Sequence, residues 1–125
     1  MGFNTHPPFF LEPMKEIFIV SIFGTLGTLL RFYFNSLNNF FPYGTLSVNL
    51  IGCLSIGFIF GSNLSSDWKT YLIVGFCGAL TTMSGFTIDL VKLSLAEEWS
   101  KLLIYFSVTL VLCILGTYIG YKFSQ

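Results

Sequence analysis

The sequence predicts an all-α membrane protein with four transmembrane helices, and three observations support this prediction. Hydrophobic residues make up 54% of the 125 residues, and the mean hydropathy is +0.76. Only 10% of the residues are charged, against about 25% in soluble domains. Most of the charges are confined to short stretches between apolar segments. This composition excludes an ordinary soluble domain and a disordered chain, so the lipid bilayer is the expected solvent.

Four apolar segments are long enough to cross a hydrocarbon core, which takes about 20 helical residues. They are residues 17–35, 44–61, 71–93 and 102–121. The connections are short and carry polar or turn-forming residues, and Trp and Tyr fall near the expected ends of the spans, as is typical of membrane interfaces. We therefore expect an N-terminal leader over residues 1–16 and a four-helix membrane domain over residues 17–125.

Basic residues are divided evenly between the two expected sides of the membrane. One side would carry Lys15, Lys69 and Lys122, and the other Arg31, Lys92 and Lys101. An excess of Lys and Arg on one side normally sets the orientation of a membrane protein. The even division favours a chain that inserts in both orientations and pairs with its own inverted copy, and chance balance of small counts is the alternative.

Several classes of function lack the residues that they need. The net charge is zero and no basic run is present, so no nucleic-acid partner is expected. His6 is the only histidine, and no nucleophile with a base, paired acids or His cluster is available, so we expect no enzyme activity. No carboxylate lies in the middle of a span, which disfavours a proton-coupled exchanger. The three cysteines lie in apolar runs without metal-ligand spacing and are interpreted as packing residues.

Polar residues inside the second and fourth spans are candidates for function because they are costly in lipid. Asn49 lies about five residues into the second span. It is expected either to hold helices together or to serve a ligand, and its position favours neither role. On the fourth span, Tyr105, Thr109 and Cys113 recur every four residues and share one face. The hydroxyls on this face either form a polar track or pack against neighbouring helices.

The middle of the third span is unusually rich in glycine and hydroxyl residues. Residues 75–87 read GFCGALTTMSGFT. This composition favours a break in the helix within the membrane, where freed carbonyl oxygens would suit a hard cation such as Na⁺. The hydroxyls of Thr81, Thr82 and Ser84 could instead donate to an anion. The alternative is an unbroken helix in which these hydroxyls bond back to carbonyls one turn earlier.

Three segments closely resemble the Fluc (CrcB) fluoride channels: GTLGTLLR at residues 24–31, GTLSVNLIG at residues 44–52 and GFCGALTTMSGF at residues 75–86. The resemblance covers about residues 17–122. It implies a multi-pass protein of the bacterial plasma membrane that exports fluoride by passive flow. It also implies an antiparallel, dual-topology homodimer with two pores, a third helix broken in the middle of the membrane, and a structural Na⁺ ion at the dimer centre.

The resemblance also implies roles for individual residues. The backbone carbonyls of Gly78 and Thr81 would bind the Na⁺ ion, and Arg31 would contribute positive potential at a vestibule. The fluoride pore would be lined by Asn49, Thr82, Met83, Ser84, Phe86, Tyr105 and Thr109. Phe86 would present the electropositive edge of its ring to the anion.

This sequence departs from the family at three positions: Met83, Gly85 and Asp89 stand where Phe, Thr and Glu are common. Met83 fills similar volume but has no aromatic ring. Some relatives pair non-identical subunits, so a non-conducting partner subunit of a heterodimer is the alternative function. A small multidrug-resistance exchanger is the less favoured alternative, since it needs a Glu that the first span lacks.

Overall fold

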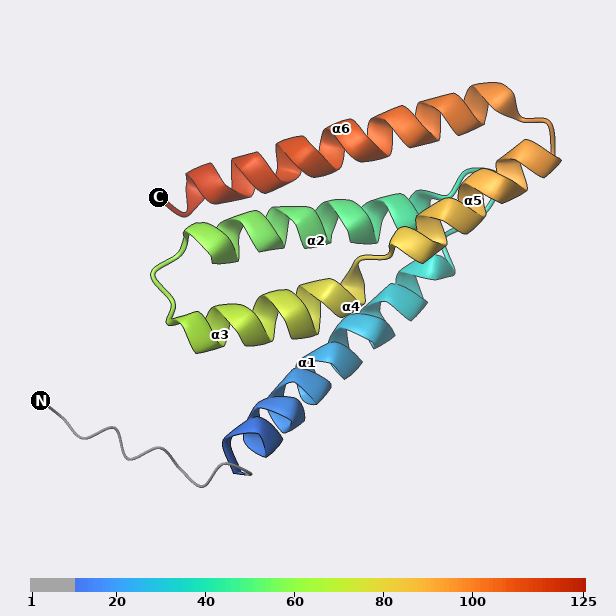
Figure 1. The fold of residues 1–125 in the computed structure, drawn as a ribbon. Helices are drawn as coiled ribbons and strands as arrows, with labels where there is room; N and C mark the ends of the chain where they lie inside the picture. The colour runs from blue at the N-terminus through green and yellow to red at the C-terminus, as the bar shows by residue number, and fades with distance from the viewer. Residues whose placement is uncertain (1–10) are drawn as a thin grey trace, which may run out of the picture.

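The computed structural model describes residues 11–125, which form helices and no strand. The elements are α1 (Leu11–Asn35), α2 (Tyr43–Gly61), α3 (Ser66–Thr70), the π-helical segment η1 (Tyr71–Cys77), α4 (Gly78–Leu80), α5 (Met83–Leu95) and α6 (Trp99–Phe123). The third span consists of α3, η1, α4 and α5 in succession, with a short non-helical step between α4 and α5 (Figure 1).

Four helical segments are long and apolar enough to cross a membrane, which confirms the predicted all-helical class and number of spans. They are Pro13–Asn35, Tyr43–Gly61, Ser66–Leu95 and Trp99–Phe123. The helices are longer than the predicted spans because polar residues at their ends continue the helical hydrogen bonding. α1 begins at Leu11, ahead of the predicted start at residue 17, so the end of the expected leader is helical. Residues 1–10 of that leader lie outside the described residues.

The spans alternate in direction. The C-terminus and the connection between α2 and α3 lie at one end of the bundle, and the connections after α1 and α5 lie at the other (Figure 1). α2 packs mainly against α6, whereas α1 packs mainly against η1 and α4. This arrangement places the two predicted groups of basic residues at opposite ends of the bundle.

Glycine allows α2 and α6 to approach closely. A Cβ atom on Gly57 would collide with the carbonyl oxygen of Thr117, and one on Gly120 would collide with that of Leu54. In lipid, where no hydrophobic force drives helices together, such close backbone contact is a main source of helix association. Small residues of the second and fourth spans therefore lie at a helix contact.

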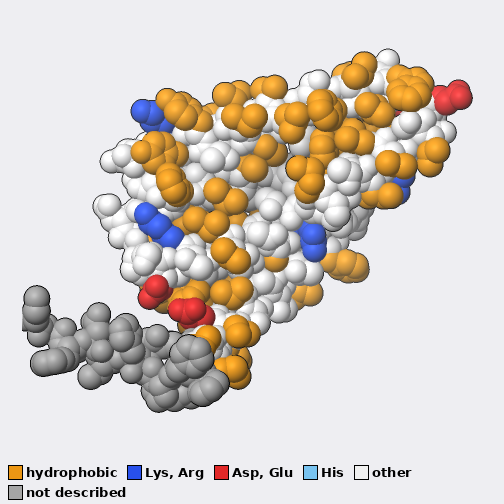
Figure 2. Space-filling view, viewed as in Figure 1, with side chains coloured by type: hydrophobic (Ala, Val, Ile, Leu, Met, Phe, Trp, Pro, Cys, Tyr) orange, Lys and Arg blue, Asp and Glu red, His pale blue; other side chains and the backbone are white. Residues whose placement is uncertain are grey.

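Much of the surface is apolar. Figure 2 shows hydrophobic side chains across most of the visible face, with most charged side chains toward the ends. Large side chains such as Phe32 and Ile114 are 78% and 69% exposed. Exposed apolar area of this extent is expected where lipid or another membrane-embedded chain replaces water.

Candidate functional site: a polar cavity at the broken helix

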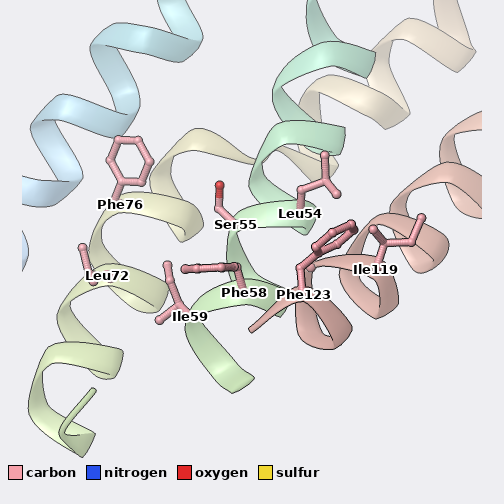
Figure 3. A pocket seen from close by; sticks show the side chains of 9 residues that line it. Leu54, Ser55, Phe58, Ile59, Leu72, Phe76, Ile119 and Phe123 are labelled. Atoms are coloured by element: carbon pink, nitrogen blue, oxygen red, sulfur yellow. The ribbon is translucent and has the colours of Figure 1, made fainter. Parts of the chain in front are cut away.

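Two of the cavities between the helices differ in chemistry. One, of about 560 Å³, lies among α2, η1 and α6, and its lining is apolar apart from Ser55 (Figure 3). The Ser55 hydroxyl donates to the carbonyl of Ile51, which leaves this cavity no free donor. A second cavity of about 250 Å³ lies beside the step between α4 and α5 and contains an amide, hydroxyls and an aromatic ring. The second cavity is the candidate site.

The step between α4 and α5 is a true break in the helix. Thr81 and Thr82 have extended backbone angles, with ψ of 151° and 108°. The Thr82 hydroxyl accepts a hydrogen bond from the backbone N–H of Gly85 at 2.8 Å, which is the usual cap for the start of a helix. The helical segment Ser66–Leu95 is therefore interrupted at residues 81–82.

The side chain of Asn49 holds the broken backbone. Its Oδ1 atom accepts from the Thr82 N–H at 2.7 Å, and its Nδ2 atom donates to the Thr82 carbonyl at 3.2 Å. Asn49 is only 6% exposed, and its Oδ1 atom replaces the helical partner that the Thr82 N–H loses at the break. The Thr82 carbonyl also accepts from the Phe86 N–H at 3.3 Å. An amide group carries two N–H donors, and one of them is left after the bond to Thr82. Asn49 thus holds two helices together and still has a donor for a ligand.

The cavity brings together residues from three helices that are distant in sequence. Five of the seven predicted pore residues line it: Asn49 from α2, Thr82, Met83 and Phe86 from the break and α5, and Thr109 from α6. The remaining lining residues are Cys53, Ile56, Thr81, Leu110, Cys113 and Ile114. No Lys, Arg, Asp or Glu is among them. The cavity is therefore uncharged, with polar atoms only where the three helices meet.

The hydroxyl of Thr109 is the only buried side-chain polar atom of the described residues that has no hydrogen-bond partner. Thr109 is 5% exposed. A buried hydroxyl without a partner costs about 1–3 kcal/mol, and a cavity occupant that accepted a hydrogen bond from Thr109 would recover this cost. Of the two roles that the sequence left open for this face of α6, the geometry at Thr109 favours the polar track.

Tyr105 and Ser84 do not line the cavity but lie next to residues that do. The Ser84 hydroxyl is 3.2 Å from that of Thr82, which extends the polar surface away from the break. Tyr105 is fully buried, with its ring 5.2 Å from that of Phe86, and its hydroxyl donates to Asp89 Oδ2 at 3.2 Å. Tyr105 also interacts with the Thr45 side chain.

Asp89 is a polar residue of this region that the sequence analysis did not select. It is 8% exposed, although its position near the end of an expected span indicated an interfacial residue. The available signal was the spacing of Phe86 and Asp89, which lie three residues apart and so face the same side of a helix. The carboxylate is linked through Tyr105 to the packing of Phe86 rather than to the cavity itself.

Arg31 and Met83 lie at the periphery of the site or outside it. Met83 lines the cavity but is 69% exposed, so it forms the outer rim. Arg31 is half-buried on α1 and does not line the cavity. The one ion pair of the described residues joins Lys101 and Glu98, so Arg31 keeps an uncompensated positive charge within them.

The carbonyl oxygens of Gly78 and Thr81 fit the proposed cation chemistry. In an unbroken helix they would accept from the N–H groups of Thr82 and Gly85. Those donors bond instead to Asn49 and to the Thr82 hydroxyl. The described residues contain no group of three or more His, Cys, Asp or Glu side chains that could hold a metal. Freed carbonyls are thus the available hard oxygen ligands for a cation at the break.

A search for known families finds one over most of the chain. Residues 18–121 match the family described as "CrcB-like protein, Camphor Resistance (CrcB)". The match includes all of the residues that line the cavity. It confirms the resemblance stated from the sequence motifs.

Individual relatives are similar along nearly their whole length. The chain is 33% identical over 122 residues to the "Fluoride-specific ion channel FluC" of Azobacteroides pseudotrichonymphae genomovar. CFP2, covering 90% of this chain and 98% of the relative. It is 35% identical over 125 residues to the protein of that name from Haemophilus influenzae strain PittGG, with the same coverage. A relative of the same name from Methanococcus aeolicus is 34% identical over 114 residues, covering 86% of this chain and 93% of the relative.

Removing the Asn49 amide should destabilise the protein. Asn49→Ala leaves the Thr82 N–H buried without a partner, at a cost of about 1–3 kcal/mol in the free energy of unfolding. The Thr82 carbonyl keeps the hydrogen bond that it accepts from the Phe86 N–H. Chemical unfolding in detergent micelles measures this change. The matched control is Ser47→Ala on the same helix, where the hydroxyl only bonds back to the Tyr43 carbonyl. Equal stability of the two variants would show that Asn49 does not hold the break.

Proposed function

The chain belongs to the CrcB-like family, and we propose that it is a fluoride-selective ion channel that lowers cytoplasmic fluoride by passive export. The observation that carries this proposal is the uncharged cavity in which the spare Asn49 donor and the unpartnered Thr109 hydroxyl lie on facing helices. The names of the relatives point to fluoride as the anion. The cavity holds neutral hydrogen-bond donors, which are the groups that a fluoride ion needs in place of its water.

Fluoride chemistry fits these donors. Fluoride is small and strongly hydrated, so a pore has to replace its water with close hydrogen-bond donors. The Asn49 amide and the Thr109 hydroxyl can each donate one hydrogen bond, and the edge of the Phe86 ring carries partial positive charge. A fixed Lys or Arg in the cavity would hold the anion too strongly for rapid passage. Neutral donors avoid this trap.

The other predicted residues would extend the polar path of the cavity or support it. The Thr82 and Ser84 hydroxyls, in contact with each other, would continue the hydroxyl track. Tyr105 would position the Phe86 ring that packs on it. Arg31, which has no ion pair among the described residues, would raise the local fluoride concentration at a vestibule through its positive charge.

A structural Na⁺ ion at the break is part of the proposal. Gly78 is exposed on the surface of the single chain, so a second copy could bring its own Gly78 and Thr81 carbonyls to the same ion. The ion would fix two broken helices against each other and would not be transported. The Na⁺ ion would also place a positive charge near the centre of the assembly.

The proposed assembly is an antiparallel homodimer in the bacterial plasma membrane. Each end of the bundle carries three basic residues, so neither orientation is favoured by the distribution of positive charge. The exposed apolar surface of the helices would be shared between lipid and the inverted copy. Met83, at the exposed rim of the cavity, would then face the partner or the mouth of a pore.

Met83 also supports the second candidate function, a non-conducting partner subunit of a heterodimeric channel. Its thioether has no ring edge to offer an anion, and the resemblance places a Phe at this position in other members. Asn49, Phe86 and Thr109 are all in place around the cavity, which favours a competent pore. A multidrug exchanger is disfavoured, since residues 17–35 contain no Glu.

Fluoride efflux from liposomes tests the proposed activity directly. The purified chain alone, in Na⁺, should release trapped fluoride and retain chloride, as read by ion-selective electrodes. Asn49→Asp should abolish fluoride efflux because it replaces a donor with a negative charge. Thr109→Val should lower efflux by about tenfold, the effect of losing one hydrogen bond of about 1.4 kcal/mol.

The control for Thr109→Val is Thr117→Val on the same helix. The Thr117 hydroxyl bonds back to the Cys113 carbonyl at 3.1 Å and lies outside the cavity, so this change should leave efflux intact. Efflux that appears only after a second, different subunit is added would replace the channel proposal with that of a partner subunit.

Removal of Na⁺ should weaken the dimer. Exchange of Na⁺ for N-methylglucamine during purification should shift the protein from dimer to monomer or reduce fluoride efflux. The reason is that the carbonyls of Gly78 and Thr81 then lose the ion that they bind. Size-exclusion chromatography with light scattering measures the change in mass. A dimer that keeps its mass and activity without Na⁺ would contradict a structural sodium site.

Dual topology predicts that both faces of the membrane display the same loop. A cysteine introduced as Asn63→Cys, in the connection between α2 and α3, should react with an impermeant maleimide from both sides of the cell membrane. Ser100→Cys, at the opposite end, serves as the matched position. Reaction of each cysteine from one side only would exclude the inverted pairing.

A further inference from the structure

Two thiols lie in the cavity one helical turn from its polar donors. Cys53 follows Asn49 by four residues on α2, and Cys113 follows Thr109 by four residues on α6. Residues four apart share one face of a helix, and all four of these side chains line the same cavity. The cavity therefore has two adjacent layers, an amide with a hydroxyl and then a pair of thiols.

The two thiols come from two helices that pack against each other, Cys53 from α2 and Cys113 from α6. Both line the same cavity, and all three cysteines are free. Cys53 and Cys113 are partly exposed, whereas Cys77 is fully buried and does not line the cavity. The interpretation of the cysteines as packing residues thus holds for Cys77 but leaves the cavity pair unexplained.

The pair offers only two ligands, and this number limits which metal ions it can bind. Zinc normally needs four ligands, or three with a water, and the described residues offer no group of three or more His, Cys, Asp or Glu side chains. Thiolates prefer soft cations. Two thiolates in one cavity therefore suit a soft cation that needs only two ligands.

Charge balance selects a divalent ion. Binding breaks two S–H bonds, forms two metal–sulfur bonds and releases two protons to water, so a dication with two thiolates is neutral. A neutral product avoids the cost of several kcal/mol for a net charge in a low-dielectric site. A monovalent soft cation would leave a net negative charge, which the cavity has no basic residue to offset.

We propose that Cys53 and Cys113 form a dithiol site for a soft, two-coordinate dication of the mercuric class, and that its occupation closes the cavity to anions. The ion would lie one turn from Asn49 in a cavity of about 250 Å³. The closing effect rests on the proposed channel function, whereas the binding itself does not.

Binding is tested on the purified full-length chain with mercuric chloride. Native mass spectrometry should find one mercury per chain with the loss of two protons, and thiolate-to-mercury absorbance should saturate at that ratio. Cys53→Ser and Cys113→Ser should each weaken binding by about 100-fold, the usual gain from holding two ligands together. Cys77→Ala, the matched control, should bind as the unchanged chain does.

The unchanged chain provides a second test that needs no variant to fold. Of its three thiols, a bridging mercury should protect two and leave a single thiol to react with a disulfide reagent after unfolding. Protection of all three thiols, or of none, would overturn the paired site. Loss of binding in Cys77→Ala with full binding in Cys113→Ser would overturn the assignment to these residues.

The functional consequence is tested by fluoride efflux from liposomes. Stoichiometric mercuric chloride should stop efflux by the unchanged chain, dithiothreitol should restore it, and Cys113→Ser should need about 100-fold more mercury. Bound mercury with undiminished efflux would overturn the closing effect. If the chain shows no efflux before mercury is added, the channel proposal fails and the closing effect fails with it. The dithiol site is then still tested by native mass spectrometry and by the thiolate-to-mercury absorbance.

Discussion

Everything at the candidate site depends on one requirement, that each backbone N–H and C=O group inside the membrane has a partner. An unpaired group in hydrocarbon costs several kcal/mol, yet the third span is broken at Thr81 and Thr82. The Asn49 amide meets the requirement at Thr82 with two hydrogen bonds, and the Thr82 hydroxyl meets it at Gly85 with one. These three bonds stabilise the interrupted helix and bring α2 to the break.

The same bonds determine what the site offers to ions. Because the N–H groups of Thr82 and Gly85 bond to Asn49 and to the Thr82 hydroxyl, the carbonyls of Gly78 and Thr81 lose their helical donors. Because Asn49 uses one of its two N–H groups for Thr82, the other is available in the cavity that Thr109 of α6 also lines. Acceptors for a cation and donors for an anion thus arise from a single distortion of the backbone. The close packing of α2 on α6 through Gly57 and Gly120 keeps the donors in place.

Much of this could be predicted from sequence, and what could not has a physical reason. Length and apolarity predicted four spans, and the Gly and hydroxyl residues of 75–87 predicted the break, because both are properties of one segment. The pairing of Asn49 with Thr82, separated by 33 residues, depends on which helices touch, and no pattern within either segment contains that information. The π-helical turn at Tyr71–Cys77 was not predicted, since its residues have no composition that separates it from an α-helix. The burial of Asp89 against Tyr105 was missed for the same reason as the Asn49 pairing.

The most direct measurement is the NMR response of the Asn49 side-chain amide to fluoride, with the protein labelled with ¹⁵N on asparagine and held in lipid nanodiscs. Asn49→Asp identifies the resonance. Asn38 is an internal reference, because its amide donates to the Thr45 hydroxyl and its Oδ1 atom accepts from the Thr45 N–H. Fluoride should shift the Asn49 resonance and leave that of Asn38 in place, while chloride at the same concentration shifts neither. If the Asn49 resonance does not shift with fluoride, or shifts equally with both anions, the result would contradict the role of Asn49 as a hydrogen-bond donor to fluoride.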